Sequence, residues 1–138
     1  MRRLSLVLPL LLAACGSSTG PTQLPSLEFE SEILFGIPTL ATTAVGSEGM
    51  IQVTGVIHTI GTGFTLTGTL TVTGPNALTL EIDAYDNRPG VYFPVQNFYR
   101  AELRLLAPGD YDLSVNHNIH SPAPGLRERV YHQTVHVN

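Results

Sequence analysis

Residues 64–72 read FTLTGTLTV, and residues 77–85 read ALTLEIDAY. In the first stretch, apolar residues and one glycine alternate strictly with threonine, and the second stretch alternates apolar with polar residues in the same way. A period of two is typical of β-strands that have one buried and one solvent-facing side. The intervening turn, Thr73-Gly74-Pro75-Asn76, predicts an antiparallel hairpin whose two apolar rows share one face.

The same alternation predicts further strands on both sides of this hairpin. We expect them within residues 27–35, 50–60, 98–106, 110–116 and 130–137. The stretch 50–60 carries apolar residues on both faces, which predicts a central or doubly covered position. Residues 98–106 also contain good helix formers, so a helix is the alternative there, but alternation and the Pro108-Gly109 turn favour a strand with Leu105 on its apolar face. About seven short strands predict an all-β, antiparallel β-sandwich over residues 27–138.

Residues 108–115 read PGDYDLSV. This segment resembles the PG-x-Y-x-L-x-V segment of immunoglobulin-like, fibronectin-like and transthyretin-like sandwiches. The resemblance implies a tyrosine corner, in which Tyr111 packs inward with Leu113 and Val115 while its hydroxyl group bonds to upstream backbone. It covers about a dozen residues and implies a type of fold, not an activity.

Composition excludes one class of partner. The chain has seven Lys and Arg against eleven Asp and Glu, none of them lysine, and its formal net charge is −4. A protein that binds nucleic acid needs a basic surface, so we expect no nucleic-acid partner. The single cysteine, Cys15, excludes an internal disulfide.

The first residues predict an export signal. Arg2 and Arg3 form a short positive region, which is followed by the apolar run LSLVLPLLL at residues 4–12. This run is shorter than the roughly 20 apolar residues that cross a bilayer. The segment Leu12-Ala13-Ala14-Cys15 resembles the lipobox of bacterial lipoproteins. The resemblance implies cleavage of residues 1–14 and acylation, for example by palmitate, of Cys15; an ordinary signal peptide with a chance cysteine is the alternative.

The lipid anchor would determine location. Two or three acyl chains anchor a protein stably, at about 0.8 kcal/mol per buried CH₂ group. Gly16 stands where an aspartate would resemble an inner-membrane retention signal, so we expect the outer membrane, or the cell membrane in a host with one membrane. Residues 15–26 contain two prolines and no charge, which predicts a flexible tether between the lipid and the domain.

The five histidines raise the possibility of a metal site. His132 and His136 share a face of one predicted strand but lie about 13 Å apart, which is too far for one ion. His117 and His120 could meet near a loop, and they are the candidate metal ligands. A second oxygen-rich segment, residues 83–87 before Arg88-Pro89-Gly90, could hold calcium, although such residues are also ordinary turn formers.

The remaining candidate site is a cluster of four aromatic residues. Tyr92, Phe93, Phe98 and Tyr99 lie close in sequence around Pro94 and could offer a flat binding surface to a sugar or a peptide. No nucleophile motif is present. The carboxylate pairs Glu81/Asp83 and Asp110/Asp112 are explained by the polar faces of strands, so we expect no enzyme.

The sequence therefore predicts a lipid-anchored lipoprotein of the cell envelope, acting as a non-catalytic binding or structural module for an envelope protein or glycan. No cofactor is expected besides the lipid on Cys15. The alternative is a periplasmic or surface metal-binding lipoprotein that uses His117 and His120.

Overall fold

The computed structural model describes residues 23–35, 40–87, 93–120 and 125–138. These residues form eight β-strands and no helix. The strands are β1 (Ser26–Leu34), β2 (Thr43–Ser47), β3 (Met50–Thr59), β4 (Phe64–Gly74), β5 (Ala77–Asp86), β6 (Val95–Arg104), β7 (Gly109–His120) and β8 (Leu126–Val137). The leader, Cys15 and residues 16–22 of the expected tether lie outside the described residues.

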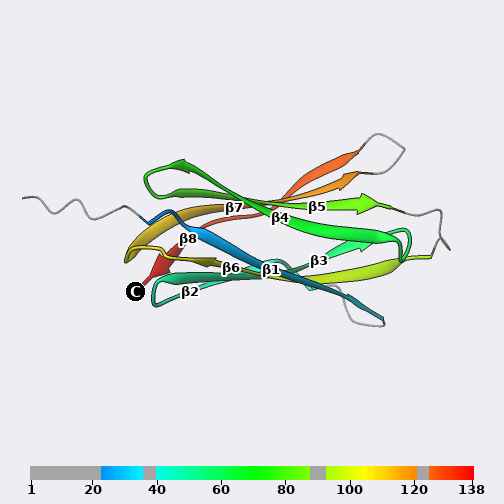
Figure 1. The fold of residues 1–138 in the computed structure, drawn as a ribbon, viewed down its shortest axis with the longest axis horizontal. Helices are drawn as coiled ribbons and strands as arrows, with labels where there is room; N and C mark the ends of the chain where they lie inside the picture. Colours follow the sequence, from blue (N-terminus) through cyan, green and yellow to red (C-terminus); the bar gives the residue numbers. More distant parts are fainter. Residues whose placement is uncertain (1–22, 36–39, 88–92, 121–124) are drawn as a thin grey trace, which may run out of the picture.

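The strands form two packed layers of four (Figure 1). Sheet A has the order β1-β6-β3-β2, and sheet B has the order β4-β5-β7-β8. The prediction of an all-β sandwich is confirmed, with eight strands instead of about seven. The additional strand is β2, whose five residues, TAVGS, are too short to show a convincing alternation. The stretch 50–60 forms β3, which lies between β6 and β2 in sheet A as its two apolar faces predict.

The predicted hairpin is present as β4 and β5. Leu66 lies opposite Ala84 and Leu70 lies opposite Leu80, so the two apolar rows share the inner face. The register shifts between Val72 and Gly74, next to the turn. The alternation that predicted this hairpin therefore also predicted which side of it is buried.

One strand pair differs from the antiparallel expectation. β5 and β7 run parallel, with Leu80 opposite Val115 and Ile82 opposite His117. Between them the chain crosses to sheet A, forms β6, and returns, so β7 runs in the same direction as β5. Immunoglobulin domains consist of two antiparallel sheets, and the parallel pair distinguishes sheet B from that arrangement.

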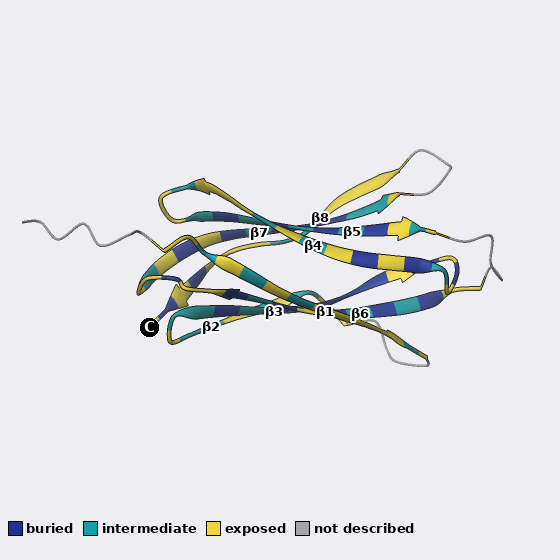
Figure 2. Ribbon diagram, viewed as in Figure 1, coloured by how far each residue is buried: buried dark blue, intermediate teal, exposed yellow. Residues whose placement is uncertain are grey.

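The core lies between the inner faces of the two sheets. Buried and exposed positions alternate along the strands (Figure 2), as one covered face requires. Several side chains are completely inaccessible to solvent: Ile51, Val53 and Leu103 in sheet A, and Leu80, Ile82 and Leu113 in sheet B. Burying each such side chain contributes about 1.5–3 kcal/mol, which is the main stabilising term of the sandwich.

The tyrosine corner implied by the sequence is present. Tyr111 is buried beside the start of β7, and its hydroxyl group donates a hydrogen bond of 2.9 Å to the carbonyl oxygen of Ala107. The bond joins the strand to the turn that precedes it. It also satisfies the polar end of a side chain whose ring belongs to the core.

Residues 95–104 form a strand, so the helical alternative is wrong for this segment. The expectation that Leu105 lies on the apolar face is also wrong, because Leu105 is 46% exposed and its neighbour Leu106 is buried. The reason is a backbone turn: Leu105 has φ of 65°, in the left-handed region that ends strand alternation. The Leu106 amide then donates a 3.1 Å hydrogen bond to the carbonyl oxygen of Gly49.

Backbone hydrogen bonds join the two sheets along the β2–β8 edge. The amide of Asn138 donates to the carbonyl oxygen of Ser47 at 3.2 Å, and the amide of Gly49 donates to that of Asn138 at 3.2 Å. Beside these bonds, Gly46 of β2 lies directly against the backbone of His136 in β8. The sandwich is therefore closed at this end of the edge, where β2 covers residues 50–54 of β3.

Candidate functional site

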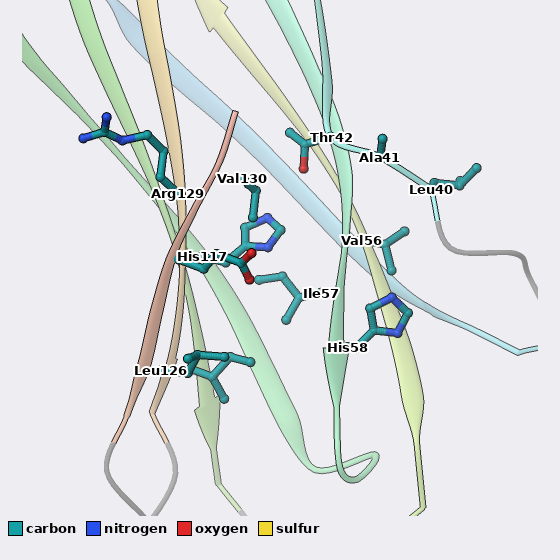
Figure 3. A pocket seen from close by; sticks show the side chains of 12 residues that line it. Leu40, Ala41, Thr42, Val56, Ile57, His58, His117, Leu126, Arg129 and Val130 are labelled. Carbon is teal, nitrogen blue, oxygen red and sulfur yellow. The ribbon is translucent and has the colours of Figure 1, made fainter. Parts of the chain in front are cut away.

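The other end of the same edge is open and forms a cavity of about 400 Å³ (Figure 3). We call it the edge cleft; it is lined by residues 40–42, 56–58, 117, 119, 126 and 128–130. Beyond Thr54, β3 has no further pairing with β2, and the described chain before β2 runs past it without strand pairing. The cleft therefore lies between an uncovered length of β3 in sheet A and the end strand β8 of sheet B.

His117 lies at the inner end of the cleft. It comes from the inner face of β7, is 9% exposed, and its Nε2 atom is hydrogen-bonded to the Tyr99 hydroxyl group at 2.9 Å. The Thr42 hydroxyl oxygen lies 3.5 Å from that of Tyr99. These three side chains, from β7, β6 and the segment before β2, join the two sheets through polar atoms at the inner end of the cleft.

Burial determines the ionisation of this pair. Burial lowers the pKa of His117 from 6.5 to about 4, and the charge of nearby His58 acts in the same direction. Burial also raises the pKa of Tyr99 to about 12, against a small opposing effect of the hydrogen bond with Thr42. Both groups are therefore uncharged at neutral pH, and the inner end of the cleft offers hydrogen bonds without charge.

Glu128 provides the carboxylate of the cleft. It lies opposite His117 in the β7–β8 register, so the two side chains share the inner face. A register shift at Val115/Asn116 leaves Val130 unpaired and reverses the facing of the residues before it. Glu128 makes no hydrogen bond or ion pair with any described residue. Simple alternation from Tyr131 would place Glu128 on the outer face. The sequence feature that indicates the register shift is the adjacent apolar pair Val130-Tyr131.

The rest of the lining is mostly apolar. Ile57 and Val130 point toward His117, Val56 lines the cleft from the other side of β3, and the guanidinium group of Arg129 points away (Figure 3). His58 is exposed at the rim. The edge cleft thus combines apolar walls, a neutral imidazole and an unpaired carboxylate. Such a site can bind an apolar side chain that has a hydrogen-bonding or cationic group nearby.

The four aromatic residues expected to form a binding surface do not lie on one face. Tyr92 is outside the described residues. Phe93 is exposed and stacks on Phe35, with ring centroids 6.3 Å apart. Phe98 lies on the outer face of sheet A, whereas Tyr99 is fully buried in the core. Phe98 and Tyr99 are consecutive in a strand, so their side chains must point to opposite sides of it.

The two histidines expected to bind metal are also separated. His117 faces the core, whereas His120 lies on the outer face of sheet B, where it bonds to Asp83 at 2.7 Å and stacks on Tyr85. An odd spacing along a strand produces this separation. Within the described parts of the chain, no group of three or more His, Cys, Asp or Glu side chains is positioned to hold a metal ion.

The remaining candidates lie on the outer face of sheet B. Glu81 and Asp83 accept hydrogen bonds there from asparagine, arginine and histidine side chains. Asp110 is bonded to His136 at 2.7 Å. The segment considered for calcium, residues 83–87, is described, and Asp83 in it is bonded to Asn118 and His120. The residues that follow it, 88–90, are outside the described residues.

Comparisons with known proteins give no relative on which to rely: the chain matches no protein-family model, no curated protein and no solved structure. Across the described residues we find no helical segment with the length and hydropathy that crossing a membrane requires.

Proposed function

We propose that this chain is a lipid-anchored lipoprotein of the cell envelope whose sandwich binds a segment of another envelope protein in the edge cleft, without catalysing a reaction. One observation carries the proposal for the sandwich. The edge cleft opens beside residues 55–59 of β3, which have no strand partner on that side among the described residues. An extended segment of a partner can add to such an edge through main-chain hydrogen bonds.

The lining of the cleft supports a protein segment as the ligand. Apolar walls such as Val56 and Leu126 accept apolar side chains, whose removal from water favours binding. The unpaired carboxylate of Glu128 favours a lysine or arginine in the partner. The neutral His117 can donate or accept one hydrogen bond without the cost of burying a charge.

The ionisation of the buried pair supports binding without catalysis. General acid–base catalysis works best with a group whose pKa lies near the working pH. His117, with a pKa of about 4, and Tyr99, with a pKa of about 12, both lie far from neutrality. The metal-binding alternative through His117 and His120 receives no support from their positions on opposite faces of β7.

Location rests on the lipobox-like segment that ends in Cys15, and the outer membrane is the proposed destination. We expect replacement of Cys15 by serine to leave the chain unacylated, so that it leaves the membrane fraction or keeps its leader. Mass spectrometry of the membrane-extracted protein should give a mature chain that begins at an acylated Cys15. An intact Met1 or an unmodified Cys15 thiol in the native protein would overturn the anchor.

Binding in the cleft can be tested in cells by site-specific photo-crosslinking. We expect a photo-reactive residue in place of His58, at the rim of the edge cleft, to capture one defined envelope protein. Glu128→Gln should reduce the yield several-fold, because it removes the unpaired charge. The matched control places the same photo-reactive residue at Thr134, which is exposed on β8 away from the cleft. Equal capture from both positions, or no capture from position 58, would contradict the proposal.

A further inference from the structure

A second concave site lies on the outer face of sheet B, on the other side of β7 and β8 from the edge cleft. It has a volume of about 450 Å³, and we call it the outer hollow. Its polar lining consists of Thr69, Glu81, Asp83, Asn118, His120 and Arg127. The proposed protein partner does not use these side chains, so the role of the outer hollow is a separate question.

Glu81 is the fixed centre of the outer hollow. One carboxylate oxygen accepts hydrogen bonds of 2.8 Å from Asn116 and from Arg127, and the other accepts one of 2.8 Å from Asn118. Partial burial raises the pKa of Glu81, but these hydrogen bonds and the charge of Arg127 outweigh that effect and hold the pKa below its usual value. Glu81 is thus an ionised and nearly saturated group, and it cannot serve as the proton donor that glycoside hydrolysis needs.

Asp83 is held next to Glu81 but keeps one oxygen available. Its Oδ1 atom accepts a 3.2 Å hydrogen bond from Asn118 and is bonded to His120 at 2.7 Å. Its Oδ2 atom makes no hydrogen bond to a described residue and is not enclosed by protein. The outer hollow therefore presents one oriented acceptor that is ready for hydroxyl donors.

A flat aromatic platform borders this acceptor. The rings of Tyr85 and His120 stack with centroids 4.4 Å apart and an interplanar angle of 6°. Tyr85 is 42% exposed and the His120 side chain is 46% exposed, so part of the stack remains open to solvent. The negative face of an aromatic ring attracts the weakly positive C–H groups on the face of a sugar.

The hydrogen-bond network of Asn118, Glu81 and Asp83 destabilises the fold at one atom. The Asn118 side chain directs its amide nitrogen at both carboxylates, and its Oδ1 atom is consequently buried without a hydrogen-bond partner in the described chain. An unsatisfied buried acceptor destabilises a protein by about 1–3 kcal/mol. Arrangements that break a local rule in this way are concentrated at functional sites.

We propose that the outer hollow binds a neutral carbohydrate, with one sugar ring on the Tyr85–His120 stack and its hydroxyl groups donating to Asp83. Two neighbouring carboxylates disfavour anionic ligands. The described residues provide no set of three metal ligands. A sugar supplies what the site lacks, namely several hydroxyl donors beside an apolar ring face. The site does not depend on the edge cleft, so either proposal can fail without the other.

The test is calorimetric titration of the purified full chain with chitotetraose, cellotetraose and maltotetraose, three uncharged oligosaccharides. We expect at least one of them to bind with a millimolar or lower Kd. Tyr85→Ala and Asp83→Asn should each raise the Kd of that oligosaccharide about tenfold, because each removes one contact with the sugar. Circular dichroism melts identify any variant that fails to fold. If Asp83→Asn disrupts the hydrogen-bond network, Tyr85→Ala still tests the proposal, because Tyr85 is exposed and its replacement should not disturb the fold.

The matched control is Asp112→Asn, an exposed carboxylate on the outer face of β7 that is not part of the outer hollow. It makes the same chemical change as Asp83→Asn and should leave the Kd unchanged. Absence of binding to all three oligosaccharides would overturn the proposal. An equal loss from Asp112→Asn and Asp83→Asn would also overturn it, because the effect would then be one of general surface charge.

Discussion

Replacing Gly46 by alanine will separate β2 from β8 and lower the free energy of unfolding by about 4 kcal/mol, which is at the upper end for a single substitution. A Cβ atom on Gly46 would overlap the carbonyl oxygen of His136 and lie 2.7 Å from its carbonyl carbon. Both atoms are backbone, so no side-chain rotation can relieve the overlap. The strands must move apart, and the hydrogen bond from Asn138 to Ser47 beside them will be lost.

Urea denaturation followed by circular dichroism measures this effect. Gly74→Ala is the control, because it makes the same change in a strand and meets only the Cβ atom of Ala77 at an ordinary 3.4 Å. We expect the Gly74 variant to unfold within a fraction of a kcal/mol of the parent. A Gly46 variant with the parent's midpoint would show that the two sheets do not meet at this position.

Acid will destabilise the sandwich through His117. The unfolded imidazole has a pKa of 6.5, and burial lowers the folded value to about 4. Between these values the unfolded chain binds the additional proton, so stability increases with pH across this window. The contribution is complete above pH 6.5 and is lost as the pH falls to 4. Its size is about 3 kcal/mol, from 1.36 kcal/mol for each pKa unit.

The effect of His117 can be separated from that of the carboxylates, which also titrate in acid. His117→Gln keeps a hydrogen-bonding group beside Tyr99 but cannot titrate. Between pH 7 and pH 4, the variant should therefore lose about 3 kcal/mol less of its free energy of unfolding than the parent does. His132→Gln removes an exposed histidine of β8 and should retain the parent's pH dependence. Identical pH profiles for the parent and His117→Gln would contradict the burial of this imidazole.

Alternation in the sequence predicts the sides of the strands well. It identifies the β4–β5 hairpin and its buried row, and the central position of β3 follows from its two apolar faces. It does not identify neighbours, since periodicity describes only one strand at a time. The parallel pairing of β5 with β7 depends on where the chain crosses between sheets, and no local pattern encodes that choice.

The candidate site was harder to predict because local backbone irregularities determine it. The bulge at Val130 turns Glu128 toward His117, and simple alternation places that carboxylate on the other side. The left-handed backbone of Leu105 likewise reverses the expected burial of residues 105 and 106. By contrast, the separation of Phe98 from Tyr99 was deducible from the sequence, because consecutive residues of a strand face opposite ways.

The strand order of sheet A has a consequence for the order of events during folding. β1 ends at Leu34, and among the described strands it pairs only with β6, which begins at Val95. The closure of so long a loop is slow, as in other folds dominated by distant pairings. Until β6 docks, the backbone of β1 has no strand partner in the described part of the chain. Charged side chains on an unpaired strand disfavour its pairing with other chains. We therefore expect the exposed Glu28, Glu30 and Glu32 to limit aggregation through β1 during this interval.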